Sequence, residues 1–315
     1  LLDASDRVIA VLGGVPPGSV GEEWRTVVEE ASKAVETFRE SSSFTKAQQH
    51  GRRGDFAFRT VGFGYGNGRK QPLNYRVNGE ANKRAVEDLL RNPAIQRIAG
   101  FQQSVFNSYS HKTFMEYQKT NEQLLRQHPH LRANFPNTAY AALTVNAGPQ
   151  SFSPPHQDPD NTVHGWCADT PLAKYNPDLG GHLVLWELRL AIRFPPGSTI
   201  LFPSALITHS TVPIQQGETR FALLQYSSGG LFRWVANGFQ SDKSFMSKAS
   251  KEEVKEREVS RLRRWKVSLS RFTRWGDLLR GDWKGIRRTE AGLDDLSDLS
   301  SCETVSVSSA KHRRI

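Results

Sequence analysis

The sequence predicts a protein of mixed α and β structure whose core is mainly β. Helical periodicity dominates the chain up to residue 134, whereas short apolar or alternating runs separated by turn residues fill 135–240. The charged composition of 241–315 marks a C-terminal tail. We therefore expect one domain over residues 21–240, with helical support at 21–134 and a β barrel or sandwich at 135–240.

The N-terminal part is predicted from its spacing. Residues 1–20 contain GGVPPGS and are expected to be a flexible segment, because glycine and proline do not favour a continuous helix. From Trp24 to Glu40 the apolar side chains recur at helical spacing and predict an amphipathic helix. Residues 80–130 are also expected to be helical, with stops before Pro93 and Pro129, because the residue before a proline disfavours helical backbone.

A glycine-rich stretch, RRGDFAFRTVGFGYGNGRKQP, occupies residues 52–72. It lacks the G-x-x-x-x-G-K-[ST] spacing of a phosphate-binding loop, and no strand-to-helix pattern surrounds it as a dinucleotide fingerprint would require. We therefore expect a glycine-rich loop or a hairpin here. Its basic and aromatic side chains are suited to contacts with nucleic acid.

Six runs between residues 135 and 240 have the composition of β-strands, with turn residues between them. The sequences PPGS at 195–198 and QQGE at 215–218 are expected to be hairpin turns. The predicted strands are YAALTVN (140–146), HLVLWEL (182–188), AIRF (191–194), TILFP (199–203), ALITH (205–209) and RFALLQY (220–226).

The C-terminal segment combines basic and acidic stretches. Residues 251–288 contain thirteen Lys and Arg against six Asp and Glu, with three tryptophans among them, and residues 289–310 are acidic and serine-rich. We expect a basic tail that is partly helical and partly disordered. Two interpretations of the basic stretch stay open, a clamp on nucleic acid and a solvated charged helix.

Composition limits the class of partner. The formal net charge of +10 favours polyanions, nucleic acid before membrane. No apolar run reaches the roughly 18 residues of a membrane span. The two cysteines, Cys167 and Cys302, argue against a disulfide framework and fit a reducing compartment. We expect a nuclear or otherwise cytoplasmic protein that is not secreted and has no membrane partner; the sequence carries no indication of its oligomeric state.

A candidate metal site begins in SPPHQDPDNT, residues 153–162. His156 and Asp158 are two residues apart, so on extended backbone their side chains share one face. A third candidate ligand, His209, follows at the end of a predicted strand. Two histidines and one carboxylate on one side of a metal, with coordination positions left open, are typical of non-haem Fe(II) oxygenases. The alternative is structural, since H-x-D in a proline-rich loop can be a polar turn.

Arg220 favours the metal interpretation. It lies eleven residues after His209, across the predicted QQGE turn. We expect the strands on either side of this turn to pair antiparallel, so that both side chains point into one barrel. A guanidinium binds a carboxylate through two parallel hydrogen bonds, so Arg220 is suited to the far carboxylate of 2-oxoglutarate, whose keto-acid end would chelate iron. His182 is a rival metal ligand, and a surface position is the alternative for Arg220.

Longer motifs carry a resemblance to a known family. The segments NFPNTAYAALTVNAGPQ, HQDPDN, GWC, GGHLVLWEL, FPPGSTILFPSALITHS, GETRFALLQY and GGLFRW resemble the fungal 2-oxoglutarate/Fe(II) dioxygenase-like proteins related to TET/JBP. The resemblance covers about residues 50–240, is densest at 134–240, and does not extend into the tail. It implies an α+β fold with a mainly β core, a double-stranded β-helix (jelly-roll) barrel with N-terminal helices packed against it.

The resemblance also implies roles for site residues. His156, Asp158 and His209 take the positions of the catalytic iron ligands, and Arg220 takes that of the arginine that binds 2-oxoglutarate. Asn161, three residues after the aspartate, takes the position of a residue that contacts the flipped base in TET-type enzymes. An Asx-turn that closes the loop is the alternative for Asn161.

One position departs from the family pattern. The family usually has a serine two residues after the arginine, and this chain has Ala222. One neutral hydrogen bond is worth about 0.5–1.5 kcal/mol, so we expect weaker 2-oxoglutarate binding and not its loss. Thr144 and Asn146, which face inward if Arg220 does, are expected to compensate as further cofactor-binding residues.

The leading functional prediction is an Fe(II)/2-oxoglutarate-dependent dioxygenase that uses molecular oxygen to oxidise a modified nucleic-acid base, with 5-methylcytosine in DNA the first candidate. A base in a duplex would have to be flipped out to reach the metal. Two alternatives stay open. The same site could hydroxylate a protein or a small molecule, because the fold does not fix the substrate. The chain could also be a catalytically inactive nucleic-acid-binding relic, and Ala222 points in that direction.

Overall fold

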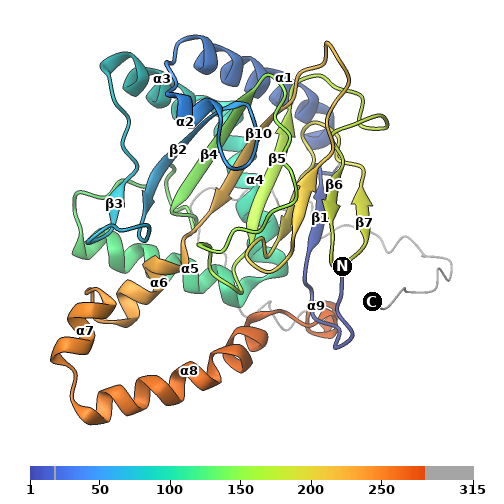
Figure 1. Ribbon diagram of the computed structural model, residues 1–315. Helices are drawn as coiled ribbons and strands as arrows, with labels where there is room; N and C mark the ends of the chain where they lie inside the picture. Colours follow the sequence, from blue (N-terminus) through green and yellow to red (C-terminus); the bar gives the residue numbers. More distant parts are fainter. Residues whose placement is uncertain (18, 281–315) are drawn as a thin grey trace.

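The computed structural model describes residues 1–17 and 19–280. Two antiparallel β-sheets form a jelly-roll barrel, and helices from the N-terminal half cover the outer face of the larger sheet (Figure 1). The core is therefore an α+β arrangement with a mainly β centre, as predicted.

The larger sheet has seven strands in the order β1-β8-β5-β10-β4-β2-β3, and the smaller sheet has three in the order β7-β6-β9. All neighbouring strands are antiparallel. Their bounds are β1 Val11–Gly14, β2 Ala57–Gly64, β3 Leu73–Asn74, β4 Ala142–Gly148, β5 Cys167–Leu172, β6 Leu183–Leu185, β7 Leu190–Ile192, β8 Thr199–Phe202, β9 His209–Thr211 and β10 Phe221–Tyr226.

The two faces of the larger sheet differ because side chains alternate along each strand. The outward set, which includes Leu143, Val145, Phe221 and Leu223, is buried against the helices in one apolar core. These helices are α1 (Ser19–Glu40), α3 (Glu80–Arg91) and α4 (Pro93–Tyr109). The inward set is more polar and faces the smaller sheet, so the barrel interior is where a site can form.

Pro93 does more than end a helix. It is the first residue of α4, where its missing N–H costs nothing. The side chain of Asn92 accepts hydrogen bonds from the backbone N–H groups of Ala94 and Ile95 at 2.9 and 3.2 Å and caps the helix. The short α2 (Lys46–Gln49) and α5 (His111–Gln127) complete the N-terminal helices.

Two buried glutamines join α4 to the larger sheet. The side-chain amide of Gln102 donates to Thr170 Oγ1 at 2.9 Å and to the Leu223 carbonyl at 3.0 Å. That of Gln225 donates to Gln102 Oε1 at 2.8 Å and to the Ala99 carbonyl at 3.1 Å. Because buried amides need partners, this network fixes the position of the helix on the sheet.

The predicted strand at 205–209 is wrong. The backbone N–H groups of Leu206 and Ile207 donate to the Pro203 carbonyl at 2.9 and 3.1 Å, which makes a turn, and β9 begins only at His209. The other five strands exist with shifted ends: β6 stops at Leu185 because a turn follows at Trp186. The sequence did not predict β5, which lies in the middle of the larger sheet.

The predicted hairpins at PPGS and QQGE are also wrong, although both turns exist. Ser198 donates to the Pro195 carbonyl at 3.1 Å, and Glu218 donates to the Gln215 carbonyl at 3.2 Å. The first turn joins β7 to β8 and the second joins β9 to β10, so each connects strands of different sheets. In a jelly roll, consecutive strands pass between the two sheets, and turn residues alone do not record this.

The expectation of a flexible N-terminal segment is wrong for the strand-forming part of residues 1–17. β1 pairs with β8 through partners such as Val11 and Leu201, and Val8 and Ala10 are buried. The pairing removes apolar side chains of this segment from water, and their burial stabilises it. The glycine-rich stretch, in contrast, forms the expected hairpin of β2 and β3.

The C-terminal region is helical in its described part, with α6 (Gly229–Ala236), α7 (Asp242–Lys248), α8 (Lys251–Arg271) and α9 (Trp275–Arg280). The expectation that the tail is also partly disordered stays a prediction, and residues 281–315 lie outside the described residues. None of the helices in the described ranges is both long and apolar enough to cross a membrane.

Candidate metal centre

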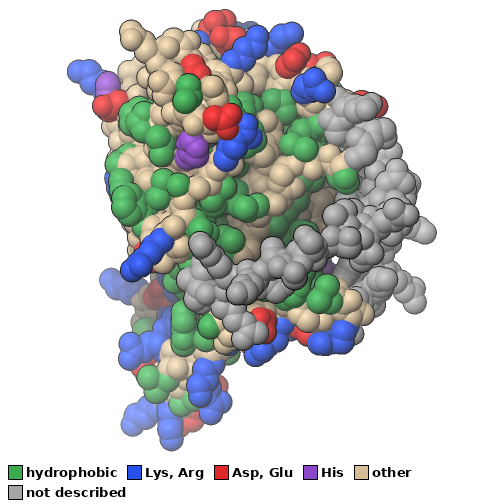
Figure 2. All heavy atoms as spheres, turned by 90° about the vertical axis from the view of Figure 1, so that its right-hand side faces the viewer, with side chains coloured by type: hydrophobic (Ala, Val, Ile, Leu, Met, Phe, Trp, Pro, Cys, Tyr) green, Lys and Arg blue, Asp and Glu red, His purple; other side chains and the backbone are tan. Residues whose placement is uncertain are grey.

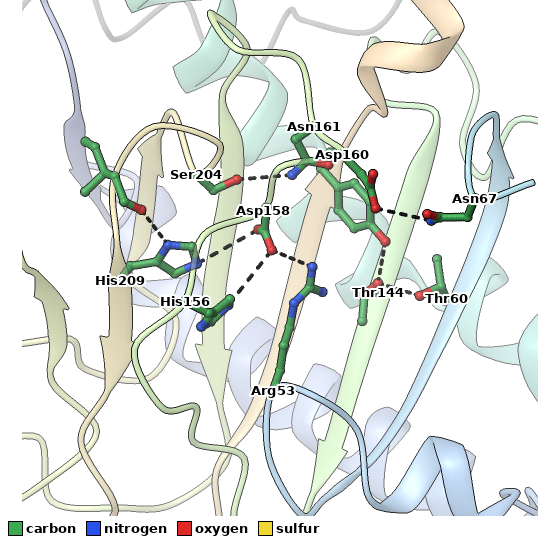
Figure 3. A network of polar contacts seen from close by, with 12 residues as sticks. Arg53, Thr60, Asn67, Thr144, His156, Asp158, Asp160, Asn161, Ser204 and His209 are labelled. Atoms are coloured by element: carbon green, nitrogen blue, oxygen red, sulfur yellow. Dashed lines mark hydrogen bonds and ion pairs between the residues drawn. The ribbon is translucent and has the colours of Figure 1, made fainter.

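Three predicted ligands meet inside the barrel. Asp158 Oδ1 lies 3.9 Å from His156 Nε2, and Asp158 Oδ2 lies 3.9 Å from His209 Nε2 (Figure 3). The three ligand atoms lie within 4.8 Å of one another, so one ion can contact all of them. Within residues 1–17 and 19–280 this is the group of His, Cys, Asp or Glu side chains that could hold a metal, and the rival His182 does not belong to it.

Backbone hydrogen bonds bring the ligands together. His156 and His209 exchange N–H···O bonds of 3.0 and 2.9 Å, so the HQD loop lies beside β9 like a further strand. The N–H of Asp158 donates to the Ser204 carbonyl at 2.9 Å. The turn that replaces the predicted strand at 205–209 therefore helps to place the carboxylate between the two imidazoles.

Each imidazole presents the correct nitrogen for a metal. Nδ1 of His156 lies 2.8 Å from the Pro154 carbonyl oxygen, and Nδ1 of His209 lies 2.9 Å from the Ile207 carbonyl oxygen. A carbonyl can only accept, so each Nδ1 carries the hydrogen and each Nε2 keeps its lone pair. Such outer hydrogen bonds also fix the ring orientation of metal-binding histidines.

Burial keeps both histidines neutral. The pKa of His209 is lowered to about 4, mainly by burial and in addition by the neighbouring His156, whereas Asp158 opposes the shift. Burial likewise lowers the pKa of His156, against the effect of the Pro154 carbonyl and Asp158. A metal therefore displaces no proton from either imidazole at neutral pH.

Arg53 contacts the centre, and the sequence did not single it out. Its guanidinium donates from Nη2 to Asp158 Oδ1 (Figure 3). This cation orients the carboxylate and balances its charge; the Arg53 side chain is 40% exposed, whereas that of Asp158 is 9% exposed. The only sequence signal for Arg53 was its position in the basic, glycine-rich stretch. Its spacing from the HQD motif did not predict that the two would be in contact.

Arg220 reaches the same cavity from the opposite sheet. A cavity of about 50 Å³ is lined by the three ligands, Arg220, Ala222 and their neighbours. Arg220 is 2% exposed and donates from Nη1 to the Ser151 carbonyl at 2.9 Å. The expected antiparallel pairing of the strands carrying His209 and Arg220 is wrong, because β9 pairs with β6 and β10 pairs with β4 and β5. Both side chains nevertheless point inward.

The guanidinium of Arg220 has unused donors. Its Nε and Nη2 are buried and have no hydrogen-bond partner among the described residues. A buried donor without a partner costs about 1–3 kcal/mol, and more if charged. A carboxylate that entered the cavity would satisfy both N–H directions at once. The residues present therefore fit a dicarboxylate cosubstrate that reaches from a metal at the triad to Arg220.

The remaining predicted cofactor residues lie on the same inner face. Ala222 pairs with Asn146, and both line the cavity. Asn146 makes no side-chain hydrogen bond to another described residue, whereas Thr144 Oγ1 lies 2.7 Å from Thr60 Oγ1 and 3.0 Å from Tyr226 OH (Figure 3). The amide of Asn146 is thus open to a ligand, and the Thr144 hydroxyl already has two partners.

Asp169 is an acidic residue of this cavity that the sequence did not indicate. It lies on β5, is 7% exposed, and its Oδ1 has no partner among the described residues. Burial raises its pKa to about 6, although the charge of Arg220 acts in the opposite direction. The carboxyl therefore partly offsets the positive charge that Arg220 offers to a ligand.

A second cavity, of about 190 Å³, adjoins the first and shares Arg53, Asp158 and Tyr226 with it. Two more tyrosines, Tyr65 and Tyr75, line it. Further polar and basic side chains complete the wall, namely Arg52, Asn67, Arg69, Asp160, Asn161 and Ser228. A planar aromatic ligand in this space would lie directly beside the metal ligands.

Asn161 lies in the wall of this second cavity. Its backbone N–H donates to the Asp158 carbonyl at 3.0 Å and closes the loop. Its side-chain amide donates to Ser204 Oγ at 3.1 Å (Figure 3). The loop is thus closed by the main chain, and the carbonyl oxygen of the amide has no partner in the described part of the chain.

Neither a protein-family model nor a curated protein sequence matches the chain. Among solved structures it is similar to NgTET1 in complex with 5mC DNA, at 14% identity, covering 64% of this chain and 69% of that one with a TM-score of 0.37. It is also similar to OsALKBH1, at 12% identity, 70% and 97% coverage and a TM-score of 0.37. A 2OG-Fe(II) oxygenase family oxidoreductase from Burkholderia pseudomallei shows 17% identity, 54% and 66% coverage and a TM-score of 0.30.

Proposed function

We propose that the chain is an Fe(II)/2-oxoglutarate-dependent dioxygenase that oxidises a modified nucleic-acid base, with 5-methylcytosine in DNA as the first candidate. One observation carries the proposal: three metal-ligating atoms and the unpartnered donors of a buried arginine face one cavity. A metal site alone would serve many reactions, and an arginine alone would serve many anions. Together they match a ligand that chelates iron at one end and carries a carboxylate at the other.

The triad would hold the metal through His156 Nε2, His209 Nε2 and a carboxylate oxygen of Asp158. With iron and 2-oxoglutarate bound, the centre would use molecular oxygen to hydroxylate a methyl group. The protein's own part is to keep both imidazoles neutral and oriented, and to hold the carboxylate through Arg53. Three protein ligands would leave further coordination positions of the metal for the cosubstrate and oxygen.

Arg220 would bind the far carboxylate of 2-oxoglutarate through Nε and Nη2, while Nη1 remains bonded to Ser151. Asn146 is placed to add a further hydrogen bond where Ala222 cannot. Thr144 would contribute mainly by fixing Tyr226, because its hydroxyl is already engaged. Asn146 would thus contact the cosubstrate directly, and Thr144 would act through Tyr226.

The second cavity supports a base as the substrate. Three tyrosines line it, and stacking of a base on an aromatic ring is worth about 1–3 kcal/mol. Arg52 and Arg69 line the same cavity and are suited to the flanking phosphates. Asn161 would read the edge of a flipped base through its free amide oxygen. The motif resemblance to fungal TET/JBP-like proteins supports 5-methylcytosine over other bases.

The test is turnover on a duplex oligonucleotide that carries one 5-methylcytosine, with the unmethylated duplex as control. Succinate and the oxidised nucleosides are measured together by mass spectrometry. The proposal expects succinate and hydroxymethylcytosine with the methylated duplex, and neither with Asp158→Asn.

Other results would contradict the substrate assignment. Turnover on peptide or small-molecule panels without any oxidised base would support a hydroxylase with another substrate. Binding of Fe(II) and DNA without turnover of 2-oxoglutarate would support an inactive relic. Asn161→Ala separates the base contact from a structural role, because it should raise KM for the methylated duplex and leave 2-oxoglutarate binding unchanged.

A further inference from the structure

A hollow of about 400 Å³ lies where four segments meet: the N-terminal segment, the start of α5, the C-terminal part of α8 and the stretch before α9. One basic side chain from each segment lines it, namely Arg7, Lys112, Lys266 and Arg274. We call these four side chains and the space between them the basic hollow. Its lining residues are different from those of both cavities at the metal centre.

The basic hollow carries an excess of positive charge, although Arg7 is paired with Asp3 at 2.9 Å. Its lining carboxylate, Asp277, is already paired with Arg280 at 2.6 Å. Lys112 and Lys266 make neither a hydrogen bond nor an ion pair with any described residue, and both are exposed. Lys112 also stands in the first turn of α5, where the helix dipole adds positive potential. Like charges held close together repel, and a bound anion would relieve this repulsion.

The hollow is held in place by the main chain. The N–H of Val8 donates to the Thr273 carbonyl, and the N–H of Trp275 donates to the Asp6 carbonyl, both at 2.8 Å. Phe272 is 7% exposed and packs in the core beside these bonds. In Figure 1 the end of α8 and α9 accordingly lie beside the N-terminal strand segment. The backbone that carries these cations is therefore fixed before an anion binds, and no backbone ordering is needed on binding.

Lys266 is also the continuation of a stripe along α8. Lys255, Val259, Leu262, Lys266 and Leu269 follow one another at alternating spacings of four and three residues, so they share one side of the helix. Val259 is 40% exposed and Leu262 is 78% exposed. Figure 2 shows Lys and Arg side chains gathered on the projecting part of the molecule below the β core.

This pattern favours nucleic acid over a membrane surface. A helix that lies in a membrane needs an apolar face separate from its charged face. On α8, Lys255 and Lys266 lie within the apolar stripe, so insertion would bury two ammonium groups at high cost. A phosphodiester backbone suits the same stripe, because Lys255 and Lys266 are about 16 Å apart along the axis, a span of about five phosphates of one strand.

We propose that the basic hollow binds phosphate groups of a nucleic-acid backbone, and that the Lys255–Lys266 stripe of α8 extends this contact. The choice of nucleic acid as the source of phosphate rests on the proposed function, whereas the unpaired charge and the frame do not. The hollow would bind phosphates of the nucleic-acid strand that lie outside the stretch containing the oxidised base. It would contribute affinity without reading sequence.

The experiment measures binding of a labelled 20-base-pair duplex to the full chain without Fe(II) or 2-oxoglutarate, over a range of salt concentrations. The double variant Lys112→Gln/Lys266→Gln removes two free cations of the hollow. The matched control is Lys33→Gln/Lys174→Gln, which removes two exposed lysines at the α1 side. Lys266→Arg serves as the conservative variant, because it keeps the charge.

The hollow double variant should bind the duplex at least about tenfold more weakly near 0.1 M salt, and the slope of log K against log salt should fall by about 1.8. The control and Lys266→Arg should stay within about twofold of wild type. Equal losses in hollow variant and control would overturn the proposal. So would binding of the wild-type chain to phosphatidylserine vesicles but not to the duplex. Because no turnover is needed, failure of the oxygenase assignment would leave this result unaffected.

Discussion

At the scale of single residues, two carbonyl oxygens set the orientation of the histidines in the candidate metal centre. By accepting from Nδ1, the Pro154 and Ile207 carbonyls leave Nε2 of His156 and His209 free for a metal. The ring is then fixed by the protein before any metal arrives, which lowers the reorganisation needed for binding. His182, which directly precedes β6, does not belong to the group of side chains that could hold a metal.

The first prediction separates these two histidines. His209→Ala removes a ligand atom and should weaken Fe(II) binding by more than about 100-fold, since even loss of an outer hydrogen bond costs 10–100-fold. His182→Ala should bind Fe(II) as the wild type does. Anaerobic isothermal titration calorimetry measures both. Equal loss in the two variants would mean that the triad does not hold the metal.

The second prediction concerns Asp169, whose pKa burial raises to about 6 from an ordinary 3.8. The folded chain therefore holds this proton more tightly than the unfolded chain, and stability is lost as pH rises from about 4 to 6. Asp169→Asn should abolish that loss. Its free energy of unfolding relative to wild type should rise by about 2–3 kcal/mol from pH 4 to pH 7.

Urea denaturation of the metal-free protein at several pH values measures this difference. Asp178→Asn is the control, because Asp178 is exposed and its pairing with Arg193 lowers its pKa. That variant should gain no stability as pH rises. A pH-independent difference between Asp169→Asn and wild type would show that the buried carboxyl is not the titrating group.

Residue-level reasoning predicted the parts of the site that share a motif. His156, Asp158 and His209 could be found because H-x-D followed by a distant histidine predicts a metal site without knowledge of how the strands pair. Arg53 and Asp169 could not, because each enters the site through a strand or loop whose position depends on the whole fold. For Asp169 the decisive property is burial, and for Arg53 it is the contact with Asp158; one sequence records neither.

At the scale of elements, the strand register fixes which side chains meet. Composition identified most strands, because β-branched and aromatic residues mark them locally. It could not say that β9 and β10 belong to different sheets, because pairing between distant strands is a property of tertiary structure. The same limit explains the missed β5, whose sequence CADTPL contains a proline and no clear alternation.

The third prediction concerns the contact between α4 and the larger sheet. Gln102→Leu removes the side-chain amide that donates to the Leu223 carbonyl, and it leaves the Gln225 amide with the Ala99 carbonyl as its remaining partner in a buried layer. We expect a loss of about 2–3 kcal/mol in the free energy of unfolding. Gln96→Leu, at an exposed position of the same helix, should change it by no more than about 0.5 kcal/mol. Denaturant unfolding that finds the two variants equally stable would contradict this role.

At the scale of the whole molecule, the two ends of the described chain meet. The N-terminal strand lies at one edge of the larger sheet, and the segment after α8 is bonded to the residues just before that strand. In the N-terminal half of α8, Arg257 donates to the side chain of Asp242. At the C-terminal end of α8, Arg271 lies 3.2 Å from Glu116. The helix is thus anchored near both ends, and most side chains between these contacts are exposed. The basic composition alone did not predict this arrangement.

The fourth prediction tests this anchoring. Phe272→Ala empties a buried position next to Val8 and should cost about 3–5 kcal/mol of local stability. Because the anchor of α8 is weakened, we expect trypsin to cleave within α8 several times faster than in wild type. Leu262→Ala, at an exposed site of α8, should leave the cleavage rate unchanged. Limited proteolysis followed by mass spectrometry locates the cuts. Unchanged cleavage in Phe272→Ala would mean that α8 is held by other contacts.

The most direct measurement is an anaerobic titration of the full chain with Fe(II) and then 2-oxoglutarate, followed by visible absorption. If the triad and Arg220 form one site, the wild-type protein should develop the metal-to-ligand charge-transfer band of a chelated keto acid. His209→Ala should show no band, and Arg220→Ala should need much more 2-oxoglutarate, because its two free donors would no longer bind the far carboxylate. Absence of the band in the wild-type protein at millimolar 2-oxoglutarate would contradict the proposed dioxygenase site.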